Sequence, residues 1–114
     1  MTTSVIVNAG DDYIGDRAVS LPPATVDISS MDLVFTVAER VSGDIVIMKT
    51  SDYAQITVDT YLEGVALVEL DGIDTLFQGN GPLNYELTGV DYDARERTLV
   101  QGRFYITTGN EAGS

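Results

Sequence analysis

Cysteine, histidine and tryptophan are absent from this sequence of 114 residues. Without Cys no disulfide can form, and without Cys or His there is neither a thiolate nucleophile nor the usual imidazole general base. Zinc sites built on Cys or His are excluded as well. Most classes of enzyme are therefore excluded before any motif is considered. We expect a protein that is not an enzyme and that needs no cofactor.

Basic residues are scarce. The 6 Lys and Arg residues face 18 Asp and Glu residues, which gives a net charge of −12. Such a surface repels phosphate, so neither nucleic acid nor an anionic membrane is an expected partner. No run approaches the ~18 apolar residues of a membrane span, and the first residues lack the basic and apolar regions of a signal peptide. With 44% hydrophobic residues the chain is expected to be one soluble domain.

Apolar residues recur at every second position, which is the period of a β-strand with one buried face. Leu33, Phe35 and Val37 form the clearest case. The same pattern is found at Ile45 and Ile47, at Ile56 and Val58, at Leu83, Tyr85 and Leu87, and at Val100, Phe104 and Ile106. Residues 64–70 also predict a strand, although its buried face is ambiguous. Several short strands at this spacing predict an all-β sandwich or a small barrel, with residues 71–77 as one short crossover helix.

Three segments are expected along the chain. Residues 1–23 are predicted to form an N-terminal strand and an extended arm, because residues 11–23 are polar and end in Pro22 and Pro23. Residues 24–108 are predicted to form the β-sandwich domain. Residues 109–114 are small and polar, which predicts a flexible tail.

Four residues are predicted to have structural tasks. Phe35, Tyr85 and Phe104 lie on the inward phase of their strands, so we expect them in the core. Tyr85 could also form a tyrosine corner, in which its hydroxyl bonds back to the backbone near the crossover. Asp27 could accept backbone N–H bonds in the turn before the Leu33 strand, or it could be a solvated edge residue.

Acidic residues gather in three places: Asp11, Asp12 and Asp16; Asp71 and Asp74; and Asp91, Asp93 and Glu96. Carboxylate oxygens could bind calcium, but none of these groups has EF-hand spacing, and turns and caps place Asp at the same positions. Paired carboxylates could also hydrolyse glycosides, but that chemistry needs a substrate cleft, which is usually lined by aromatic residues. The absence of tryptophan argues against such a cleft in this sequence. We therefore expect solvated turns, with no metal site and no catalytic residues.

The strongly β-prone run Val5, Ile6 and Val7 is the clearest candidate interface. It could be the first strand of the sandwich, or it could pair with a neighbouring subunit through main-chain hydrogen bonds. On the second interpretation, residues 1–23 contribute to contacts between subunits, and the core still folds without residues 1–10. Tyr13 and Tyr105 are further candidates for contacts, although they lie on separate segments.

Two stretches together resemble a known family. Residues 26–37 run from Val-Asp-Ile-Ser through a short turn to Phe-Thr-Val. Residues 74–81 open with Asp-Thr, residues 85–87 read Tyr-Glu-Leu, and residues 98–106 read Thr-Leu-Val-Gln-Gly-Arg-Phe-Tyr-Ile. In this order and at this separation, with the Gly-Asp pair at residues 10–11, the motifs are similar to the N-terminal domain of the baseplate upper protein type of tailed phages. The resemblance spans residues 10–108.

The resemblance implies an immunoglobulin-like antiparallel β-sandwich without catalytic residues. It further implies a structural protein of the virion, assembled in the host cytoplasm, that docks fibre or receptor-binding components onto the tail, baseplate or neck. Its partners would be other virion proteins, and it would form a homo-oligomer or a symmetric ring in the particle. A capsid decoration protein and a carbohydrate- or calcium-binding β-sandwich module are the alternatives.

Overall fold

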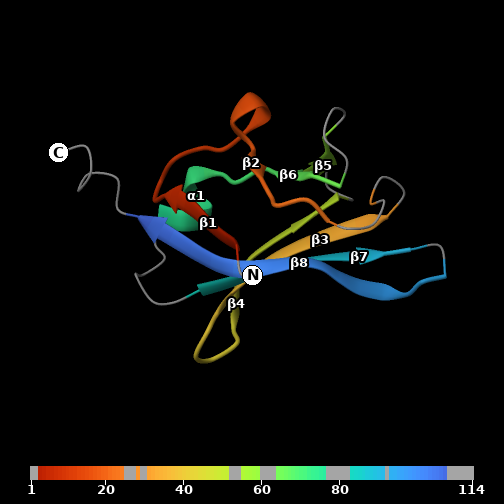
Figure 1. The fold of residues 1–114 in the computed structure, drawn as a ribbon. Coiled ribbons are helices and arrows are strands. Elements are labelled where there is room, and N and C mark those ends of the chain that lie inside the picture. The colour runs from red at the N-terminus through yellow and green to blue at the C-terminus, as the bar shows by residue number, and fades with distance from the viewer. Residues whose placement is uncertain are drawn as a thin grey trace.

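The computed structural model describes residues 3–24, 28, 31–51, 55–59, 64–76, 83–91 and 93–107. In this part of the chain, eight strands form two sheets around one hydrophobic core (Figure 1). One short helix and one 3-10 turn, η1 (Gly15–Arg17), complete the elements. Asp27 and residues 109–114 lie outside the described residues, so the predictions for them stay predictions.

The larger sheet has five strands. Its order is β1 (Thr3–Asn8), β8 (Glu96–Thr107), β7 (Leu83–Val90), β3 (Asp32–Glu39) and β4 (Ile45–Thr50). All neighbours run antiparallel except β1 and β8, which run parallel. The two edges of this sheet are therefore β1 and β4.

The smaller sheet has three antiparallel strands in the order β2 (Val19–Ser20), β6 (Ala66–Val68) and β5 (Ile56–Val58). When β2 is matched to strand B of an immunoglobulin domain and the later strands follow in chain order, the order β2-β6-β5 corresponds to B-E-D. In the same way, β8-β7-β3-β4 in the larger sheet corresponds to G-F-C-C′. The predicted immunoglobulin-like β-sandwich is confirmed. The helix α1 (Gly72–Leu76) connects β6 to β7 and is the predicted crossover. Within the described residues, no helix is long and apolar enough to cross a membrane.

Aromatic side chains occupy the centre of the core. Phe35, Tyr85 and Phe104, which the alternation places inward, are almost completely buried. The Phe35 ring lies 5.9 Å from the Tyr85 ring and 6.2 Å from the Phe104 ring, measured between centroids. Because the three residues come from β3, β7 and β8, these contacts join the three central strands of the larger sheet.

Residues 11–23 belong to the sandwich, which corrects the extended arm expected there. Val19 and Ser20 pair with β6, Leu21 is buried in the core, and Tyr13 forms a bridge with Leu70. A strand of two residues is too short to show an alternating pattern, so β2 cannot be predicted from the sequence. The predicted boundary after Pro23 therefore does not separate an arm from a domain.

A second correction concerns β4. Ile45 and Ile47 have the same parity, yet Ile47 is buried and Ile45 is exposed. The register explains the difference, because Val37 faces Ile47 whereas Ala38 faces Ile45, with Val46 left over as a bulge. A bulge adds one residue to a strand, so residues of the same parity on its two sides face opposite sides of the sheet.

The strand β6 has the buried face that the sequence left ambiguous. Its residues Ala66 and Val68 are both buried, so these two side chains face the core.

Candidate interaction surface

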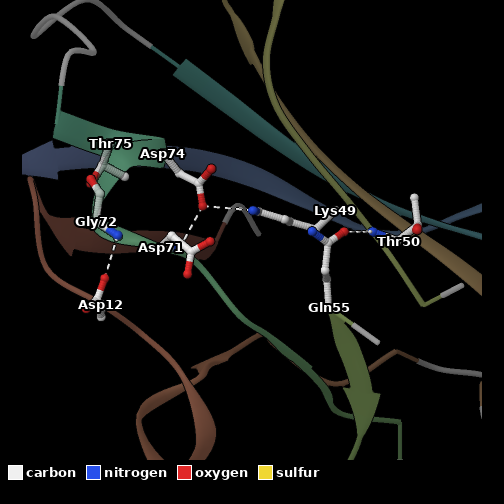
Figure 2. Close-up of polar contacts among 8 residues, drawn as sticks. All are labelled: Asp12, Lys49, Thr50, Gln55, Asp71, Gly72, Asp74 and Thr75. Carbon is white, nitrogen blue, oxygen red and sulfur yellow. Dashed lines mark hydrogen bonds and ion pairs between the residues drawn. The ribbon is translucent and has the colours of Figure 1, made fainter. Parts of the chain in front are cut away.

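The polar residues around α1 connect parts of the fold (Figure 2). Lys49 of β4 reaches α1, where its Nζ lies 2.8 Å from Oδ2 of Asp74. The same oxygen accepts the N–H of Asp71 at 2.7 Å. On the other side of the helix, Oδ1 of Asp12 accepts the N–H of Gly72 at 2.7 Å. These carboxylates therefore fix the crossover to an edge strand and to the N-terminal segment.

The acidic residues near β7 and β8 also act within the fold. Oδ1 of Asp91 accepts the N–H groups of Asp93 and Arg95, and Oδ2 lies 3.7 Å from Nε of Arg97. Among the described residues, no group of three or more His, Cys, Asp or Glu side chains could hold a metal ion. The side chain of Asp16 lies outside this part. The carboxylates of Asp12, Asp74 and Asp91 are thus engaged in hydrogen bonds and ion pairs within the fold.

Four large exposed apolar side chains lie on one surface, two toward each edge, which we call the outer face: the side of the five-stranded sheet turned away from the core. Ile6 lies between the buried Val5 and Val7, and Tyr105 lies between the buried Phe104 and Ile106. At the other edge, Met48 is exposed between the buried Ile47 and Lys49. Ile45 joins this face through the bulge in β4.

The two edge strands of this sheet differ in how well they are protected against pairing with a strand of another molecule. Natural edge strands avoid aggregation by means of bulges, inward-pointing charges, prolines or short length. The edge strand β4 has two such devices, the bulge at Val46 and the inward-pointing Lys49. In contrast, β1 reads Thr-Ser-Val-Ile-Val-Asn and pairs with β8 in one continuous register. It contains no charge, proline or bulge, so β1 is the edge that is open to another strand.

Tyr13 helps to define how much of the β1 edge is open. Its hydroxyl oxygen accepts the N–H of Asn8 at 2.7 Å, and the carbonyl of Asn8 accepts the N–H of Asp11 at 3.3 Å. Both backbone groups of Asn8 therefore point away from β8. Because alternate residues of a parallel strand face the same neighbour, Ser4 and Ile6 also direct their N–H and C=O groups to this open side.

The predicted interface residues divide into three groups. Val5 and Val7 are 6% and 1% exposed and pack in the core, because β1 pairs with β8 within the same chain, as the first of the two interpretations expects. Tyr13 is half-buried and caps the end of β1. Only Ile6, which is 64% exposed, and Tyr105 lie on the outer face, where they sit opposite each other in the β1–β8 register.

Beside Tyr105, the outer face contains a shallow hollow of about 680 Å³. It lies across β3, β7 and β8, and Arg40 at the end of β3 and Arg103 of β8 are among its lining residues. The hydrogen bond with Arg103 and the positive charges of Arg103 and Arg40 lower the pKa of the Tyr105 hydroxyl from its ordinary value of 10.0. Two of the chain's 6 basic residues therefore lie beside one exposed phenol.

Sequence reasoning did not identify these two arginines. Arg103 has the same strand parity as Tyr105, and this signal places both on one face. Arg40 follows β3 in a hairpin, where the sequence contains no periodic signal. This surface provides backbone hydrogen-bonding groups, apolar area and charged donors, which are the elements of a protein-binding site.

Comparisons with known proteins do not assign the chain to a family. No family model and no curated protein sequence matches it significantly.

Proposed function

We propose that this protein is a non-enzymatic structural component of a tailed-phage virion. It would be an adaptor that docks fibre or receptor-binding components onto the tail, baseplate or neck. The resemblance of residues 26–37 and 98–106 to the phage domain supports this role, and an immunoglobulin-like sandwich is the fold which that resemblance implies. The observation that carries the docking role is the open edge of β1, with the exposed Ile6 beside Tyr105.

The energetics of such an edge favour docking. A partner strand beside β1 would bond to the backbone of Ser4 and Ile6, which gives affinity without special side chains. Covering Ile6 would remove a large apolar side chain from water, which stabilises the complex by about 1.5–3 kcal/mol. The net charge of −12 repels other copies of the chain until a complementary surface is met.

Photo-cross-linking in the particle tests this role. A photoreactive residue at position 6 is compared with one at Thr57, which is exposed on the smaller sheet. We expect the protein in purified particles, with cross-links to tail, neck or baseplate proteins from position 6 and far fewer from position 57. Cross-links to the major capsid protein would favour the decoration role instead. Absence of the protein from particles would contradict the proposal.

A further inference from the structure

We infer that the hollow between Arg40 and Arg103 binds a single carboxylate of an extended peptide segment in a partner protein. This site goes beyond the proposed function, because it lies on β3, β7 and β8 rather than on the edge of β1. It would hold for any protein partner, whether or not that partner belongs to a virion.

The register of the sheet creates the hollow. Asn84 lies opposite Arg103, and Glu86 lies opposite Gln101. Between these two outward pairs lie Tyr85 and Gly102, and the Tyr85 side chain points into the core. The floor is therefore backbone, and the outward pairs form two walls. On the third side, β3 contributes the small residues Thr36 and Ala38.

Arg40 is held at one end of this hollow. Its Nε donates to Oδ1 of Asn84 at 3.2 Å, and its Nη2 donates to the carbonyl of Leu83 at 3.4 Å. These bonds fix the guanidinium over β7, so less conformational entropy is lost when a ligand binds. Arg103 reaches the same region from β8, where it lies beside the Tyr105 hydroxyl and lowers its pKa.

Neither of the two arginines forms an ion pair within the described part of the chain. Lys49 pairs with Asp74 and Arg97 with Asp91, but no described carboxylate lies within 4.0 Å of Arg40 or Arg103. In a protein with a net charge of −12, these arginines form a positive spot among acidic residues. A planar guanidinium matches the geometry of a carboxylate, with which it forms charge-assisted hydrogen bonds.

The surroundings of the hollow select a peptide with one acidic residue. Glu86 lines the second wall, and it would repel an additional negative charge. The apolar side chains of Tyr105 and Met48 share the outer face with the hollow, and they would cover the apolar residues beside the bound carboxylate. Arginine and tyrosine among apolar residues are typical of protein interfaces.

Nuclear magnetic resonance titration tests this inference on the intact protein. The probe is a short acetylated and amidated Val-Glu-Val peptide, with Val-Gln-Val as its neutral control. We expect the amide signals of Asn84 and Gly102 to shift with the Glu peptide, and the Gln peptide to bind about tenfold more weakly, since a charged hydrogen bond is lost. Equal binding of both peptides would overturn the inference.

Three variants define the site. Arg103→Gln should weaken binding of the Glu peptide about tenfold, whereas Glu86→Gln should strengthen it. Ile6→Lys should leave binding of this short peptide at the hollow intact, which separates this site from the edge of β1. All three residues are at least partly exposed, so the variants should fold, as circular dichroism would show. Unchanged binding by Arg103→Gln, or the same shifts with inorganic phosphate at lower concentration, would refute a carboxylate site.

Discussion

Lys49 and Asp74 form an ion pair that connects an edge strand of the larger sheet to the crossover helix (Figure 2). Lys49 is the only lysine of the sequence, and its side chain is 8% exposed, against 20% for Asp74. A buried charge is costly unless it is paired, so each partner depends on the other.

Asp74→Asn should therefore destabilise the protein more than Lys49→Met. The first variant leaves the Lys49 ammonium buried without its counter-ion, for a loss of about 3 kcal/mol in the free energy of unfolding. The second removes the charge and keeps most of the aliphatic volume, while Asp74 keeps the N–H of Asp71, so the loss should be about 1 kcal/mol. Urea unfolding measures both values. A larger loss for Lys49→Met would show that the pair is not the dominant interaction.

Truncation of the central aromatic residues should cost far more. Phe35→Ala and Phe104→Ala each remove a fully buried ring and leave a cavity, so we expect losses of about 3–5 kcal/mol. The matched control is Val41→Ala, because Val41 is 90% exposed in the β3–β4 hairpin, and its loss should stay within about 0.5 kcal/mol. If either Phe variant melts within a few degrees of the wild type, the described core is wrong.

The two tyrosines of β7 and β8 should titrate on opposite sides of pH 10. Burial raises the pKa of Tyr85, whereas the hydrogen bond with Arg103 lowers the pKa of Tyr105. The fold thus prefers neutral Tyr85, and this preference contributes stability below pH 10 that is lost as the pH rises through the raised pKa. Ionised Tyr105 contributes stability above pH 10, and that contribution is lost as the pH falls through the lowered pKa.

Ultraviolet absorbance of the phenolate measures both tyrosines. Tyr105→Phe should remove a component that titrates below pH 10, and Tyr85→Phe should remove one that titrates above it. A Tyr105→Phe variant that retains the whole low-pH component would show that the two arginines do not face this hydroxyl.

Deletion of residues 1–10 should destabilise the whole sandwich. Only one of the two interpretations of the sequence has the core fold without them, and Val5 and Val7 are buried in that core. Each buried valine contributes about 1.5–3 kcal/mol, and the pairing of β1 with β8 is lost as well. For a domain of ordinary stability, about 5–15 kcal/mol, this loss is large. Thermal unfolding followed by circular dichroism tests it, and an unchanged melting temperature would contradict the role of β1 in the core.

Sequence patterns were sufficient where a strand alternates over many residues. In β3 and β7, apolar residues at every second position identify both the strand and its buried face, as Leu33 and Leu87 illustrate. The β2 strand escapes such reasoning because Val19 and Ser20 are only two residues. Ile45 is misassigned because a bulge depends on how two strands pair, and pairing is a nonlocal property.

The candidate site was only partly predictable for the same reason. Alternation puts Ile6, Arg103 and Tyr105 on one side of their strands, but it does not reveal that β1 lies beside β8. That neighbourhood arises from a parallel pairing between the two ends of the chain. Arg40 reaches the site from a hairpin, so only the folded structure brings it to the hollow.

The central claim, that the open edge of β1 docks a partner, is tested most directly by incorporation into particles. Ile6→Lys places a charge on the open edge, and Thr57→Lys places one on an exposed position of the smaller sheet. Both variants should keep the wild-type melting temperature, because both positions are exposed. Each variant competes with the wild type for incorporation, and quantitative mass spectrometry of purified particles measures the ratio. Ile6→Lys should be depleted about tenfold, which corresponds to a loss of about 1.4 kcal/mol in binding free energy. Thr57→Lys should be incorporated normally. Equal incorporation of Ile6→Lys and the wild type would contradict the account.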